Sequence, residues 1–99
     1  MRNLKINELK LGANEINLTV KVVSVSEPRN VRTKLGYQTR VATATIEDDT
    51  GQMMLTLWGR QIDEIGEGDT VEIKNGYVTE FRGELQLNVP RKGEIKRVD

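Results

Sequence analysis

Three of the chain's four aromatic residues stand at positions that a β-strand would turn away from its core. They are Trp58, Tyr77 and Phe81. In segment 55–58 a strand places Leu55 and Leu57 on one face and Trp58 on the other, because successive side chains alternate. In segment 77–81, Val78 is the inward residue and both rings point outward. An outward row of rings can stack on flat partners, and unpaired nucleic-acid bases are partners of this kind.

An alternative role for these rings is to fill the core of a small domain. Tryptophan is highly buried on average, and Tyr77 or Phe81 would also serve to close one end of a barrel. The alternation favours the outward position, because burying Trp58 would turn Leu55 and Leu57 toward solvent. From these residues alone, stacking and core packing both remain open.

Positive charge is concentrated in one part of the chain. The net charge is zero, with 15 basic and 15 acidic residues, and that balance alone argues against a nucleic-acid-binding domain. However, segment 28–46 has no acidic residue, whereas segment 63–72 has no basic one. We predict one cationic and one anionic region of surface. The cations that can contact phosphates as a group are Arg29, Arg32, Lys34, Arg40, Arg60 and Arg82.

The composition restricts both size and chemistry. The 99 residues suffice for one domain with one core, spanning 1–99. Cysteine and histidine are absent, which excludes disulfides, thiolate zinc sites and a histidine base. The adjacent carboxylates Asp48 and Asp49 are explained by a turn, and no further metal ligand is evident. We predict no catalytic residue, no metal and no cofactor.

The sequence also bears on location. No apolar run is long enough to span a bilayer, and the first residues do not have the pattern of a secretory signal. We therefore expect a soluble protein without membrane contact, located in the cytoplasm.

Five segments with alternating or β-branched residues predict five strands. They span residues 16–25, 37–47, 52–58, 70–81 and 85–89. The basic stretch after Pro28, residues 29–36, is typical of an exposed loop, and segment 48–51 is typical of a turn. Ile62 and Ile65 predict one or two helical turns against a barrel end. The inward residues of the second strand are predicted to be Ala42, Ala44 and Ile46.

The fourth strand needs an extra residue to keep its apolar side chains on one face. Those side chains are Val71, Ile73 and Val78. We predict a bulge at Asn75–Gly76, with Gly76 at positive φ. A two-residue hairpin at Asn75–Gly76 is the alternative, since Asn-Gly is a strong hairpin signal. A turn at Arg82–Gly83 favours the bulge, because a second hairpin would leave two very short strands.

These elements predict an all-β fold, a five-stranded OB-fold Greek-key barrel with a short helix between its third and fourth strands. A β-sandwich is the runner-up, although it usually needs more strands and more length. In an OB barrel the ligand face lies on the second and third strands, between the loops that join strands one to two and four to five. The basic stretch and the Arg82 turn fall at these two walls.

Four groups of residues, in order along the chain, carry a specific resemblance. They are Ser26–Arg29 with Thr33–Lys34, Asp49–Gly51, Leu55–Gly59 and Tyr77–Asn88. Together they resemble the archaeal single-stranded DNA-binding proteins with one OB domain, and the OB domain of eukaryotic SOSS-B proteins is similar. The resemblance runs over nearly the whole chain, and the ordered combination is far more specific than any one segment.

The resemblance implies a sequence-tolerant binder of single-stranded DNA in replication, recombination or repair. Bases are then expected to stack on Trp58, Tyr77 and Phe81, and Val31 stands where the family has an aliphatic contact. It further implies a monomeric, nucleoid-associated domain whose partners include repair or replication proteins. The expected groove and phosphate contacts are Arg29, Val31, Arg32, Thr33, Lys34, Arg40, Thr56, Arg60, Thr79 and Arg82.

Two departures from the family pattern stand out. Tyr77 occupies a position where close archaeal relatives often have tryptophan, so the stacking surface is smaller. The family's Gly-rich, acidic C-terminal tail, which contacts repair and replication proteins, is not within these 99 residues. We therefore expect either a domain of a longer protein or a protein that works without this tail.

Two other functional classes stay open. An OB module of a larger assembly would bind RNA in the same groove, since no residue here is specific for DNA. A protein-interaction OB domain would use the aromatic row to dock a peptide or a second subunit.

Overall fold

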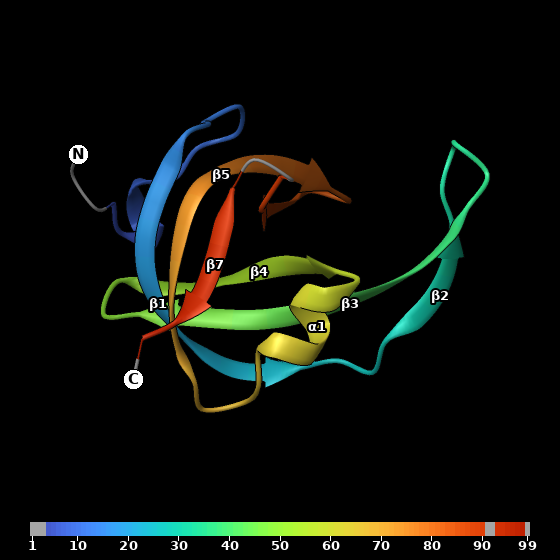
Figure 1. Ribbon diagram of the computed structural model, residues 1–99. Coiled ribbons are helices and arrows are strands. Elements are labelled where there is room, and N and C mark those ends of the chain that lie inside the picture. The colour runs from blue at the N-terminus through green and yellow to red at the C-terminus, as the bar shows by residue number, and fades with distance from the viewer. Residues whose placement is uncertain (1–3, 91–92, 99) are drawn as a thin grey trace.

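The computed structural model describes residues 4–90 and 93–98 (Figure 1). A 3-10 helix, η1 (Ile6–Glu8), precedes the first strand, and one α-helix, α1 (Arg60–Glu64), lies between the fourth and fifth strands. No helix in these two ranges is both long enough and apolar enough to cross a membrane. The strands are β1 (Ile16–Val25), β2 (Arg29–Arg32), β3 (Gln38–Asp48), β4 (Gly51–Trp58), β5 (Thr70–Phe81), β6 (Glu84–Asn88) and β7 (Glu94–Arg97).

Five of these strands close into a ring. The order around the ring is β1, β3, β4, β6 and β5, and β5 pairs back with β1. The β4–β6 pair is parallel, whereas the other pairs of the ring are antiparallel. This is the predicted five-stranded barrel with a short helix between its third and fourth strands, and the β-sandwich alternative is wrong because the sheet closes on itself.

The inward faces predicted from alternation form one core. Leu55 and Leu57 of β4, and Ala44 and Ile46 of β3, are fully buried. The same holds across the ring, where the buried cluster includes Leu18, Val20, Val22, Val71, Ile73, Val78 and Leu87. The period of two therefore placed the core correctly.

The basic stretch predicted as a loop is partly a strand. Residues Arg29–Arg32 form β2, which pairs antiparallel with residues 38–41 of β3. The prediction of a loop was wrong because β3 extends beyond the ring and offers an unpaired edge, so the backbone of segment 29–32 makes ladder bonds in place of bonds to water. Figure 1 shows this hairpin projecting away from the ring, and we call residues 29–40 the basic arm.

A seventh strand was also missed. Residues 94–97 form β7 and pair with residues 71–74 of β5. This half of β5 is free on one side because β6 pairs only with residues 77–81. Burial of Ile95, which is 7% exposed, holds the strand in place.

The bulge in β5 is present, but not with the predicted backbone. Ile16 of β1 faces Gly76 and Leu18 faces Ile73, so β5 holds the extra residue. The positive φ belongs to Asn75, at 61°, and not to Gly76. Asparagine tolerates the left-handed region better than most residues, which leaves the glycine free for another role. The predicted bulge is confirmed, the hairpin alternative is wrong, and the predicted φ of Gly76 is wrong.

The turn at 48–51 anchors η1 across one end of the ring. Asp48 accepts hydrogen bonds from the backbone N–H of Ile6 at 2.8 Å and of Thr50 at 2.7 Å, and from the Thr50 hydroxyl. Partial burial raises the pKa of the Asp48 carboxyl, but these bonds and the charge of Lys5 outweigh burial and leave that pKa below its ordinary value. The paired aspartates therefore have a structural role, as the turn prediction implied. Within the described residues, no cluster of carboxylates could hold a metal ion.

Candidate nucleic-acid interface

The three aromatic side chains singled out from the sequence lie on the outside of the closed sheet. Trp58 is 43% exposed, Tyr77 38% and Phe81 56%. Their inward neighbours Leu57 and Val78 are buried. The alternative that these rings fill the core is therefore wrong, and their exposure requires another explanation.

The registers of three strands position two of the rings. Thr56 of β4 faces Asn88 of β6, and Asn88 in turn faces Tyr77 of β5. Trp58 is two residues beyond Thr56 on the same face of β4. These pairings bring two aromatic side chains, nineteen residues apart in the chain, onto one surface with two polar side chains between them.

The end of β4 is held by specific bonds around Trp58. The backbone N–H of Trp58 donates to Oε1 of Gln61 at 3.0 Å, and that of Gly59 donates to the Arg40 carbonyl at 2.9 Å. Gly59 has φ of 54° and ψ of −120°, a conformation that suits glycine. The chain therefore leaves the sheet directly after the ring, and Trp58 sits on an ordered backbone.

Two adjoining hollows flank Trp58, which lines both of them. The first, which we call the Phe81 hollow, has a volume of about 550 Å³ and lies between the sheet and the basic arm. The second, the Tyr77 hollow, has a volume of about 940 Å³. Because Trp58 and Thr33 line both, the two hollows adjoin, and each of the three aromatic rings lines at least one of them.

Most of the predicted contact residues line these hollows. Arg60 lines the Tyr77 hollow, and Thr33 lines both. Those that line the Phe81 hollow with Trp58 and Phe81 are Arg29, Val31, Arg32, Thr33, Lys34 and Thr56. The structure therefore brings residues from the arm, β4 and β5 to one place, although they are separated by up to about fifty positions in the sequence.

Three of the predicted contacts lie elsewhere. Arg40 forms an ion pair with Asp63 of α1, with Nη2 and Oδ2 2.7 Å apart. The Thr79 hydroxyl accepts a hydrogen bond from Asn88 at 2.9 Å. Arg82 lies over the Phe81 ring, with its guanidinium carbon 5.2 Å from the ring centroid. This cation–π contact keeps Arg82 beside a stacking surface, whereas Arg40 is occupied by a carboxylate.

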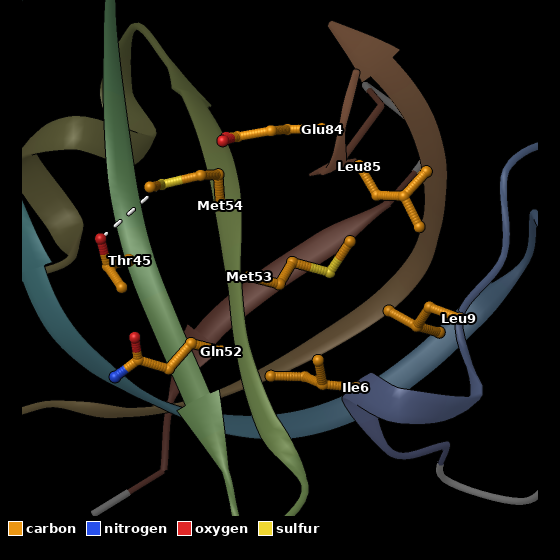
Figure 2. A pocket seen from close by; sticks show the side chains of 8 residues that line it. All are labelled: Ile6, Leu9, Thr45, Gln52, Met53, Met54, Glu84 and Leu85. Carbon is orange, nitrogen blue, oxygen red and sulfur yellow. Dashed lines mark hydrogen bonds between the residues drawn. The ribbon is translucent and has the colours of Figure 1, made fainter. Parts of the chain in front are cut away.

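A third hollow differs in character from these two. It has a volume of about 320 Å³ and lies between η1, β4 and the start of β6. Figure 2 shows Ile6, Leu9, Met53 and Leu85 around its apolar part, while the Thr45 hydroxyl donates to Met54 Sδ at its rim. Among residues 4–90 and 93–98, no lysine or arginine lines it, and no residue lines both it and either of the other two hollows. Its described lining therefore lacks the cations that a nucleic-acid backbone requires.

Comparison with known proteins assigns the chain to a family. Residues 9–97 match the family described as "Single-stranded DNA binding protein Ssb-like, OB fold". The chain belongs to this family. Its members are binding proteins and not enzymes, in agreement with the prediction from composition. The resemblance and the OB fold predicted from the sequence are both confirmed.

Individual relatives agree with this assignment. The chain is 41% identical over 91 residues to the single-stranded DNA binding protein Ssb of Saccharolobus solfataricus, covering 92% of this chain and 61% of that protein. It is 34% identical over 98 residues to replication factor A of Methanothermobacter thermautotrophicus, covering 95% of this chain and 12% of that protein. The chain thus spans only part of each relative.

Solved structures show the same fold. The second OB-fold domain of replication protein A from Methanococcus maripaludis superposes with a TM-score of 0.82 at 27% identity. The match covers 99% of this chain and 96% of that domain.

Some residues that line the hollows were not predicted from the sequence. In the Phe81 hollow they are Val41, Thr43, Gln86 and Asn88, and in the Tyr77 hollow they include Leu35, Tyr37, Thr39 and Gln61. Most of them alternate with predicted inward residues, such as Thr43 between Ala42 and Ala44. The outward faces of the second and fifth predicted strands would have identified these residues, because outward residues alternate with the inward ones.

Proposed function

We propose that this protein binds single-stranded DNA with little sequence preference, by stacking bases on Trp58, Tyr77 and Phe81 and contacting phosphates through the basic arm. The observation that carries the proposal is the pair of adjoining hollows, sharing Trp58, whose linings include all three exposed rings. Ring faces stack on any base, which makes such binding tolerant of sequence. The S. solfataricus relative is named a single-stranded DNA binding protein.

Charge on the arm supports the phosphate contacts. Within the residues that the structure describes, Arg29, Arg32 and Lys34 form no ion pair, whereas Arg40 is paired with Asp63. Unpaired cations beside exposed rings are available to phosphates, because no internal carboxylate has to be displaced first. We assign the strongest phosphate contacts to these three residues, with Arg60 and Arg82 beside the rings.

The relatives support a proposal for the biological setting. Because one of them is a replication factor A, we propose a role in replication, recombination or repair, in the cytoplasm at the nucleoid. The protein acts there without catalysis, as a monomeric domain, and repair or replication proteins are its proposed partners.

Titration with oligonucleotides tests this function directly. Trp58 is the only tryptophan, so its fluorescence reports on one ring of the proposed site. We expect quenching by single strands at much lower concentration than by duplex of the same sequence, and similar affinity for different sequences apart from a modest preference for pyrimidines. Equal affinity for duplex would refute the proposal, and preference for a matched RNA strand would assign the groove to RNA. Absence of any response, with self-association on gel filtration, would favour a protein-interaction domain.

Salt dependence tests the phosphate contacts separately. If roughly three to five cations neutralise phosphates, log affinity should fall with log salt at a slope of about −2 to −3.5, since each phosphate on a single strand contributes about 0.7. Lys34→Gln should make this slope shallower. Lys21→Gln removes the same charge from an exposed position that lines neither hollow, and it should leave the slope unchanged. A wild-type slope near zero would show that the arm does not touch the backbone.

A further inference from the structure

The fourth aromatic residue, Tyr37, is also exposed beside the proposed site. Its side chain is 51% exposed, and it lines the Tyr77 hollow together with Trp58 and Tyr77. Leu35, which is 84% exposed, lines the same hollow. Large apolar side chains gathered at one exposed depression indicate a binding surface more often than a solvated one.

The register of the arm shows which way Tyr37 points. Side chains of β3 alternate, and Ala42 and Ala44 point into the core. The residues at odd positions of β3, Thr39, Val41 and Thr43, therefore share the opposite face, and Tyr37 directly precedes β3. Val41 faces Trp58 in the β3–β4 ladder. Tyr37 lines the same hollow as Thr39 and Trp58, which places it on the same side of the sheet as Trp58.

The backbone at Tyr37 is fixed. Its carbonyl accepts hydrogen bonds from the N–H of Thr33 at 2.9 Å and from the Thr33 hydroxyl at 3.2 Å. The N–H of Gly36 donates to the Thr33 carbonyl at 3.0 Å, and Gly36 has φ of 90°. These bonds close the tip of the arm into a defined turn. A ring on such a backbone loses little freedom when a ligand stacks on it.

We propose that Tyr37 is a fourth base-stacking residue, which extends the binding site into the Tyr77 hollow by one nucleobase of the bound strand. The chemistry is that of the other three positions, an exposed ring face beside cations, here Arg60. The inference rests on the proposed function, because it uses the same strand and the same depression. It differs in its consequence, since the site is longer than three rings alone would make it.

The test compares variants on a series of oligothymidylates of increasing length. We expect wild-type affinity to rise with length and then level off, and Tyr37→Ala to level off about one nucleotide earlier. On the longest oligomers Tyr37→Ala should bind about fivefold to a hundredfold more weakly, the range observed for loss of one stacked base. Tyr37→Phe keeps the ring face and should bind like the wild type. The salt slope should not change, because no cation has been removed.

Controls separate this inference from the function on which it rests. Gln38→Ala changes an exposed neighbour on the other face of the arm and should have no effect. If Trp58→Ala loses affinity while Tyr37→Ala binds and levels off like the wild type, the inference is wrong and the proposed function stands. If Trp58→Ala also binds like the wild type, the proposed function fails as well.

Two further outcomes would overturn the stacking role specifically. Equal losses in Tyr37→Ala and Tyr37→Phe would mean that the hydroxyl, and not the ring face, makes the contact. A weaker salt slope in Tyr37→Ala would mean that the arm has moved and taken its cations with it. Should Tyr37→Ala fail to fold, Tyr37→Leu keeps an apolar side chain without a ring and should show the same early levelling off.

Discussion

Replacing Trp58 with alanine is expected to weaken binding of single-stranded DNA about fivefold to a hundredfold, while the thermal midpoint stays close to that of the wild type. Each base stacked on an aromatic ring contributes roughly 1–3 kcal/mol by alanine substitution. Trp58 should give the largest effect of the three rings, because it is the largest and lines both hollows. Tyr77→Ala and Phe81→Ala should follow, with the salt slope unchanged in each.

The opposite pattern would identify the rings as structural. Removing a buried aromatic side chain costs about 3–5 kcal/mol, a large share of a small domain's stability. A variant that melts early but binds normally under folding conditions would therefore contradict the proposed role. Leu11→Ala is the matched control, because Leu11 is 58% exposed and lines neither hollow. It should change neither quantity.

The second large effect is expected at Gly76, where valine should lower stability by about 1–3 kcal/mol. Gly76 is buried in β5, and a Cβ atom there would lie 3.2 Å from the Asn88 carbonyl oxygen, 3.2 Å from Leu87 Cδ1 and 3.4 Å from Ile73 Cγ2. The backbone oxygen belongs to the ladder between β5 and β6, so it cannot move without disturbing that pairing. Valine adds two methyl groups beyond the Cβ, so the Leu87 and Ile73 side chains must also shift within a packed core.

The same substitution should also weaken DNA binding. Tyr77 follows Gly76 directly and faces Asn88 across the ladder, so displacement of β5 from β6 would redirect its ring. Chemical denaturation and fluorescence titration of Gly76→Val measure the two losses. Gly66→Ala is the control, since its Cβ would meet only the Asp69 carboxylate at an ordinary 3.7 Å. Unchanged stability in Gly76→Val would show that β5 and β6 are not packed as closely as the structure indicates.

The bulge illustrates where prediction from a pattern was right for a partly wrong reason. The sequence required one extra residue between Ile73 and Val78, and the structure has it. The left-handed conformation was assigned to Gly76 because glycine adopts it most easily. In the fold, Asn75 takes that conformation, and Gly76 is needed because the Asn88 carbonyl approaches it. The Asn88 carbonyl belongs to a strand twelve residues further along the chain, so its approach to Gly76 cannot be predicted from the residues around Gly76.

The cations, like the bulge, were predicted only in part from the sequence. The gap in acidic residues over 28–46 correctly indicated a basic region, but equal weight was given to every cation in it. The fold pairs Arg40 with Asp63 of α1 and brings Arg29 and Lys34 to the Phe81 hollow. Which charges are free depends on where α1 packs, and its residue Asp63 is 23 positions away from Arg40 in the sequence.

The sequence by itself determined the strands of the closed sheet, the inward face of each strand and the absence of cysteine and histidine chemistry, and it favoured the outward position of three aromatic side chains. These features follow from the period-two alternation and from composition, which are local properties of the chain. Only the tertiary structure decided that segment 29–32 pairs with β3, that 94–97 pairs with β5, and that Tyr37 shares a hollow with Trp58 and Tyr77. Strand pairing and shared hollows join segments far apart in the chain, so they depend on which edges closure of the ring leaves unpaired, and not on the residues of either segment alone.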